Sequence, residues 1–135
     1  MSSAPWVRSM QPDVQPTLRG MFESQRSFME LLQAKRGFPQ FPVDIKSRDG
    51  QRLLHDTAHY AMDELHEAMQ HLKNSKAHRA TEVRELDRQK YVEELVDHVH
   101  YFVELCILSG ITDDELYDAY IAKHAVNVQR VHEGY

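Results

Sequence analysis

The sequence is short of cysteine, glycine and proline, has no long apolar run and carries no excess of positive charge. Its 135 residues include one cysteine, five glycines and five prolines, and the net charge is −5. A lone cysteine cannot form an internal disulfide, so Cys106 is expected in the core of a protein from a reducing compartment. Without an 18-residue apolar run or a basic field, neither a membrane nor a nucleic acid is an expected partner. We therefore expect a soluble, cytoplasmic protein.

Helix-forming residues dominate what remains, and their apolar members recur at helical spacing. No segment alternates with the period of a strand, and short polar connections separate the periodic stretches. The sequence therefore predicts an all-α protein folded as a four-helix bundle. Residues 1–16 are interpreted as a Pro-rich N-terminal tail and residues 17–135 as a single domain. The predicted helices cover about 17–36, 50–73, a segment from before Leu86 to about Ser109, and 112–131.

Capping residues mark several of these helix ends. Thr17 is a candidate N-cap for the first helix, and Gly37 is a candidate stop for it. Gly110 should end the third helix. The Thr-x-x-Glu spacing from Thr112 to Glu115 forms a capping box that should open the fourth helix.

Acidic pairs flank the apolar stripes of the second and third predicted helices. Glu64 and Glu67 lie three residues apart in "MDELHE", and Glu94 and Asp97 repeat that spacing in "EELVD". Residues at this spacing share one side of a helix, so two facing helices would gather four carboxylates at the edge of the core. Carboxylates this close repel one another, and a hard divalent cation such as Mg²⁺ or Mn²⁺ would relieve the repulsion. Taken alone, either pair would be typical of a solvated face.

The last predicted helix carries a row of side chains suited to phosphate oxygens. Lys123, Asn127 and Arg130 fall at i, i+4 and i+7 and therefore line one face. An ammonium, an amide and a forked guanidinium together match the oxygens of a polyphosphate, although each alone would be typical of a solvated face. Carboxylates for metal and a cationic row for phosphate are the requirements of metal-assisted phosphoanhydride cleavage.

These motifs, in this order, resemble the all-α NTP pyrophosphatases, which join MazG-like enzymes and the dimeric dUTPases, including phage versions. That superfamily has the pattern Glu-Glu-x-x-Glu and then, after a gap, Glu-x-x-Asp; here 26 residues, 68 to 93, separate Glu67 from Glu94. Asp63 replaces the first Glu, which leaves the role of that position open. The Lys-x₃-Asn-x₂-Arg ending looks like the dUTPase branch, whereas the short chain looks like MazG. The resemblance extends over about 17–131.

The resemblance implies hydrolysis of a nucleoside triphosphate to the monophosphate and pyrophosphate, as part of the control of dNTP pools. The four carboxylates would be catalytic ligands of two or more Mg²⁺ or Mn²⁺ ions, with one glutamate doubling as the base for the attacking water. Lys123 and Arg130 would neutralise the phosphate chain, and Asn127 would donate to phosphate or sugar. A homodimer or a dimer of dimers, with sites near the subunit interfaces, is implied as well.

Selection of the base is the part of the function that the sequence specifies least. The first predicted helix should cover the open side of the site, and its candidates for contacting a base are Phe22, Gln25 and Phe28. Both Phe residues are also typical of a core. Gln25 interrupts the apolar face, and its amide both donates and accepts. The dUTPase-like ending favours a deoxynucleotide, with dUTP slightly ahead of a purine dNTP such as dGTP.

Two other functions fit parts of the sequence. Asp63-x-x-His66 and Asp97-x-x-His100 imitate, with Asp, the Glu-x-x-His helices of a di-iron carboxylate bundle. The first and last helices would then each have to supply an inward Glu, and none of their glutamates is well placed for this. A helical binding or scaffold protein without catalysis is the other alternative. Mg²⁺-dependent turnover, an iron-dependent optical band, or neither would separate the three.

Overall fold

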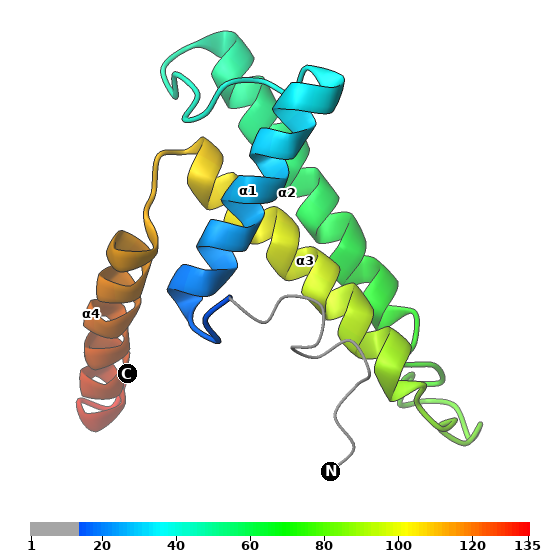
Figure 1. The fold of residues 1–135 in the computed structure, drawn as a ribbon. Coiled ribbons are helices and arrows are strands. Elements are labelled where there is room, and N and C mark those ends of the chain that lie inside the picture. The colour runs from blue at the N-terminus through cyan, green and yellow to red at the C-terminus, as the bar shows by residue number, and fades with distance from the viewer. Residues whose placement is uncertain (1–13) are drawn as a thin grey trace.

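The computed structural model describes residues 14–135, which form four α-helices and no strand (Figure 1). The predicted all-α, four-helix class is therefore confirmed. The predicted tail lies almost entirely outside the described residues, and the division of the chain at residue 17 stays a prediction. The helices are α1 (Leu18–Arg36), α2 (Arg48–Met69), α3 (Arg88–Leu108) and α4 (Asp113–His132).

Side-chain caps explain where the helices begin and end. The Thr17 hydroxyl accepts from the Gly20 N–H at 3.1 Å, and the Thr112 hydroxyl accepts from the Glu115 N–H at 3.1 Å, as the sequence predicts. Gly37 closes α1 with a left-handed φ of 65°, a conformation that glycine adopts without steric cost.

Two predicted boundaries are wrong by a few residues. Helix α2 ends at Met69 rather than near residue 73, because the chain turns there through a Leu72 N–H to Met69 carbonyl bond of 3.0 Å and a left-handed Asn74. Helix α3 begins at Arg88, since Asp87 takes the N-cap position and accepts from the Lys90 N–H at 3.2 Å.

The core lies where α1 crosses α3, with α2 packed along the length of α3 (Figure 1). Met29 of α1 and Leu108 of α3 are fully buried there. Cys106 is buried and unpaired, as expected, and burial raises the pKa of its thiol. Burial of this apolar cluster is the main stabilising term for the packing of α1 on α3. The buried members of the cluster are Phe22, Met29, Val103, Cys106, Ile107 and Leu108.

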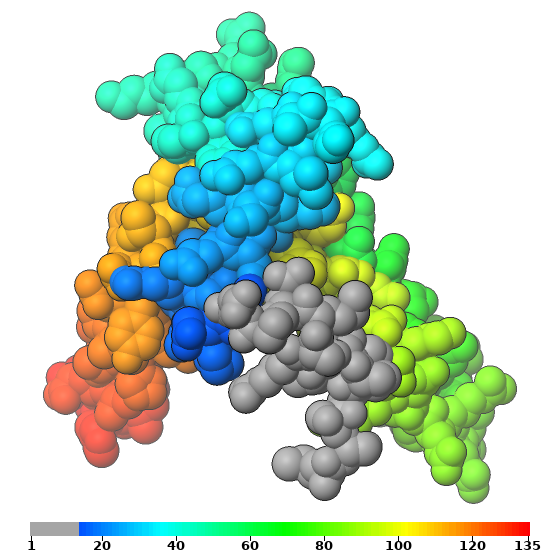
Figure 2. All heavy atoms as spheres, viewed as in Figure 1, coloured from blue at the N-terminus to red at the C-terminus, as the bar shows by residue number. Residues whose placement is uncertain are grey.

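Helix α4 is set apart from the other three. The chain bends by 107° between α3 and α4, and α4 buries none of its residues. Among residues 14–135, α4 packs against α1 and against neither α2 nor α3. Figures 1 and 2 show α4, in orange and red, diverging from the α2–α3 pair beyond the first turns of α1.

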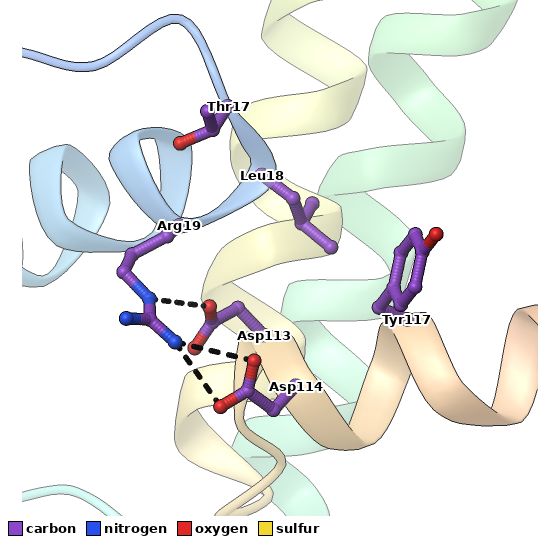
Figure 3. A pocket seen from close by; sticks show the side chains of 6 residues that line it. All are labelled: Thr17, Leu18, Arg19, Asp113, Asp114 and Tyr117. Atoms are coloured by element: carbon purple, nitrogen blue, oxygen red, sulfur yellow. Dashed lines mark hydrogen bonds and ion pairs between the residues drawn. The ribbon is translucent and has the colours of Figure 1, made fainter.

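An ion-pair fork joins the first turns of α1 and α4 (Figure 3). The Arg19 guanidinium lies 3.2 Å from Asp113 and 3.1 Å from Asp114, and these bonds raise the Arg19 pKa further above its usual range. Leu18 and Tyr117 flank the fork and line, with it, a hollow of about 430 Å³. The direction in which α4 leaves the core is therefore set by this contact and the short 109–112 connection.

Within residues 14–135, no single helix is long and apolar enough to cross a membrane. The bent pair α3–α4 would meet that requirement by length and composition.

Candidate active site

The antiparallel α2–α3 pair sets the spacing of the candidate site. The His98 ring donates from Nδ1 to the Ala61 carbonyl at 2.6 Å, and the centroids of the Tyr60 and Tyr101 rings lie 5.6 Å apart. Ala61 is buried, and its small side chain lets the two backbones come close at this level. These contacts fix the register, so the next turn of α2 faces the preceding turn of α3. The carboxylates lie in those turns.

Three carboxylates converge there, as the sequence predicts. One carboxylate oxygen from each of Glu64, Glu94 and Asp97 lies within 4.8 Å of the others. Glu64 and Glu94 are partly buried, and Asp97 is exposed. Oxygen-only donors at this separation are the ligands that a hard divalent cation such as Mg²⁺ or Mn²⁺ takes, so the triad is compatible with a divalent metal.

The fourth predicted carboxylate, Glu67, lies next to the triad rather than within it. Its effect is visible on Glu64, whose pKa is raised to about 7, first by burial and then by the charges of Glu67, Asp97 and Glu94. A carboxyl with this pKa is about half protonated at neutral pH. The neighbouring negative charges therefore favour the protonated form of Glu64. A cation bound between the carboxylates would reduce this repulsion.

Two histidines border the carboxylates at longer range. The His71 Nε2 lies 3.9 Å from Glu94, and the His100 Nδ1 lies 3.9 Å from Asp97. His66 does not join them, since its ring contacts the Gln70 side chain at 3.1 Å. The sequence reasoning missed His98. Its only signal in the sequence was its position next to Asp97 in "VDHVH".

The structure does not bring the cationic row of α4 to the carboxylates of the same chain. Lys123, Asn127 and Arg130 are all exposed, and their helix packs against neither α2 nor α3. The Arg130 guanidinium lies 5.3 Å from the centroid of the C-terminal Tyr135 ring. A phosphate-binding role for this row therefore requires another chain or another orientation of α4.

The three residues predicted to contact a base occupy different environments on α1. Phe22 lies in the core cluster at 6% exposure, and Gln25 is buried beside it at 8%. Phe28 is exposed to solvent at 51%. A role for any of them in contacting a base stays a prediction, with Phe28 the one that a ligand could reach without displacing the core.

The di-iron arrangement finds less support in the geometry. Such a site needs a carboxylate from each of four helices. Within residues 14–135, the converging acids come from α2 and α3 alone, and the glutamates of α1 and α4 are exposed.

A family model described as dUTPase matches residues 63–135, more than half of the chain. The matched segment contains the end of α2, all of α3 and all of α4, and with them every predicted carboxylate and the whole cationic row. No curated protein and no solved structure matches the chain.

Proposed function

The chain belongs to the dUTPase family of all-α nucleoside triphosphate pyrophosphatases, and from this premise we propose that it hydrolyses dUTP to dUMP and pyrophosphate. Nucleoside triphosphate hydrolysis in general follows from the family. The choice of dUTP over a purine dNTP, the metal requirement and the roles of individual residues are the proposal.

The observation that carries the proposal is the convergence of Glu64, Glu94 and Asp97 within 4.8 Å inside the segment that matches the family. A nucleoside triphosphate carries several negative charges, and three carboxylates without a bound cation would repel it. Binding becomes favourable only when cations lie between the two sets of oxygens. The acidic triad and the anionic substrate therefore both point to the same partner, a divalent ion.

Glu64, Glu67, Glu94 and Asp97 would hold the ions, which we take to be two or more Mg²⁺ or Mn²⁺. When bound, such ions neutralise the triphosphate and make a water nucleophilic enough to attack the α-phosphorus. The protein side chains would then have two tasks, to hold the ions and to take up a proton. A glutamate of the cluster would accept the proton of the attacking water as the general base.

We further propose that the cationic row reaches the carboxylates from a second copy of the chain. Helix α4 buries nothing in its own chain, and both it and the α2–α3 pair expose apolar side chains. Faces of this kind tend to pair symmetrically, giving a homodimer or a dimer of dimers. In such an assembly Lys123, Asn127 and Arg130 of one copy would bind the phosphates and sugar held at the other. The exposed apolar residues of α4 include Tyr117, Tyr120, Ile121, Val126, Val128 and Val131.

The direct test is pyrophosphate release from a panel of all dNTPs and NTPs, with Mg²⁺, with Mn²⁺ and with a chelator. We expect metal-dependent release with dUTP as the best substrate. Preference for a purine dNTP would overturn the choice of base but keep the reaction, and no release from any nucleotide would overturn the reaction itself.

A further inference from the structure

The connection from α2 to α3, with the first turn of α3, carries an excess of positive charge. Residues 71–90, the basic segment, contain six basic side chains and three acidic ones, in a chain whose net charge is −5. All six basic side chains are exposed, so each is accessible to a ligand in solution. They are Lys73, Lys76, Arg79, Arg84, Arg88 and Lys90.

The basic segment adjoins the carboxylate cluster. The His71 Nε2 lies 3.9 Å from Glu94, so the segment begins beside one of the three converging carboxylates. At its other end, Lys90 precedes Glu94 by four residues on the same side of α3, about 6 Å along the axis. Glu67 lies two residues before α2 ends at Met69. Both ends of the basic segment therefore lie within one or two helical turns of the cluster.

The carboxylates and the basic side chains are close in the chain but do not neutralise one another directly. Among residues 14–135, none of the six basic side chains of the segment forms an ion pair. The carboxylates are thus left for a cation, and the basic side chains are left for an anion. A metal-bound polyphosphate satisfies both, because its metal contacts the acids while its outer oxygens attract the basic groups.

The cationic row of α4 cannot take this place within the same chain. The 21 residues of α3 separate the basic segment from the start of α4 by about 30 Å. Figure 1 shows the green connection and α4 at opposite sides of the molecule. Within one chain, the basic segment rather than the α4 row therefore adjoins the carboxylates.

Charge indicates which way a nucleotide would lie along the α2–α3 pair. A nucleoside triphosphate carries its negative charge at one end, and its sugar and base are uncharged. The basic segment lies on one side of the carboxylates. On the other side, one turn before Glu64 and one turn after Asp97, lie the paired rings of Tyr60 and Tyr101, which carry no positive charge. The terminal phosphates are therefore attracted toward the connection.

We propose that the basic segment binds the two terminal phosphates of the metal-bound triphosphate through Lys73 and Lys90, and holds them as they leave as pyrophosphate. This inference rests on the proposed function and adds a phosphate contact made by the chain that holds the metal. Lys73 lies two residues after His71, and Lys90 one turn before Glu94, so the two lysines approach the cluster from both ends of the segment. An ammonium has three donors on a flexible stem, which suits phosphate oxygens that change position during the reaction. The α4 row then remains for the α-phosphate and the sugar.

The test measures the binding of magnesium pyrophosphate by calorimetry, which requires no turnover. Lys73→Gln combined with Lys90→Gln should raise the dissociation constant of magnesium pyrophosphate by about 10-fold, because two charge-assisted contacts are lost. KM for dUTP should rise by a similar factor. Inhibition by dUMP should be unchanged, since dUMP lacks the terminal phosphates. The Tm should also be unchanged, because both lysines are exposed.

The matched control removes two positive charges outside the basic segment. Lys35→Gln combined with Lys46→Gln changes exposed residues near the end of α1 and just before α2 begins. This double variant should bind magnesium pyrophosphate as wild type does. An equal loss of affinity in the control would mean that only net charge matters, and would overturn the inference.

The remaining outcomes separate the inference from the proposed function. If wild type does not bind magnesium pyrophosphate, or if Lys73→Gln with Lys90→Gln binds it equally well, the inference is wrong whether or not a nucleotide is hydrolysed. If dUMP inhibition weakens as much as pyrophosphate binding, the lysines do not act on the terminal phosphates. If the two lysines are required for pyrophosphate binding but no nucleotide is hydrolysed, the phosphate site stands and the proposed reaction fails.

Discussion

The α2–α3 pair and α4 are built from helices of similar length, 22, 21 and 20 residues, yet they are held in place by different means. The pair is fixed by burial, with Thr57 and Ala61 of α2 buried along its length and Val103 and Ile107 of α3 in the core. Helix α4 is held by an ion-pair fork, by the partly buried Leu116 against the core cluster, and by a short connection. Packing specifies geometry within a fraction of an ångström, whereas exposed ion pairs contribute little and are screened by salt.

The difference matches the tasks proposed for the two regions. Converging carboxylates must be held at metal-binding separation against their own repulsion, which only a packed pair of helices can do. Cationic side chains that bind a flexible phosphate chain must be able to reach it, but they do not need a fixed distance from one another. The closely packed half therefore suits metal binding and chemistry, and the lightly packed attachment of the other half suits capture of substrate. Each prediction below tests one side of this contrast.

The largest effect is expected at the rigid half. Asp97→Asn removes one charge from the triad and should lower kcat by at least about 100-fold, because losing a ligand should cost more than losing the groups that orient it. Helical content by circular dichroism should be unchanged, since Asp97 is exposed. Glu93→Gln is the matched control: it neutralises an exposed acid on the same helix outside the triad and should keep near-normal activity. Full activity in Asp97→Asn would remove the carboxylates from the mechanism.

The next effect tests where the cations of α4 act. Arg130→Ala should lower kcat/KM, because it removes charge-assisted hydrogen bonds. Their loss should cost about 1–3 kcal/mol of transition-state stabilisation. Mixing Arg130→Ala with Asp97→Asn chains should then restore part of the activity, because one site of the mixed dimer would combine intact carboxylates with an intact α4. Recovery after mixing and refolding is measured against each variant alone. The absence of recovery, with mixed dimers shown by mass spectrometry, would place the row in the same chain as its carboxylates.

A smaller effect concerns stability and pH. The pKa of Glu64 is raised from 4.5 to about 7, so the folded protein binds this proton more tightly than the unfolded chain. Its contribution to stability is fully present below pH 4.5 and is lost as the pH rises through 7. Metal-free Tm should accordingly fall across this window, Mg²⁺ or Mn²⁺ should restore it above pH 7, and Glu64→Gln should flatten the profile. A Glu64→Gln profile with the same slope as wild type would assign the titration to another group.

The smallest effect is expected at the fork between α1 and α4. Arg19→Ala should leave the Tm nearly unchanged, because the pair is exposed. It should instead raise KM for the nucleotide more than it lowers kcat, and the difference from wild type should shrink in high salt. Arg19→Asp combined with Asp113→Arg and Asp114→Arg should recover the wild-type KM. Equal KM values for wild type and Arg19→Ala would mean that the 109–112 connection alone directs α4.

Local signals were sufficient to predict the helices and the carboxylate cluster. The caps at Thr17 and Thr112 and the stop at Gly37 depend on one or two residues, and the acid spacing on α2 and α3 depends only on helix geometry. The sequence could not predict the separation of α4, because the periodic apolar pattern of a helix is the same whether its partner is its own chain or another.

The absence of buried residues in α4 has a consequence for dilution. A 20-residue helix that packs on its own chain only through its first turns gains little tertiary stabilisation beyond its own backbone hydrogen bonds. If assembly supplies the missing contacts, helix formation in α4 is linked to subunit association by mass action, and the fraction of folded α4 depends on protein concentration. Lowering the protein concentration below the dissociation constant of the dimer would then unfold α4 while the α2–α3 pair stays folded. The proposed phosphate-binding row on α4 would be lost with it. Enzyme abundance would thus set not only the number of active sites but also the fraction that is complete.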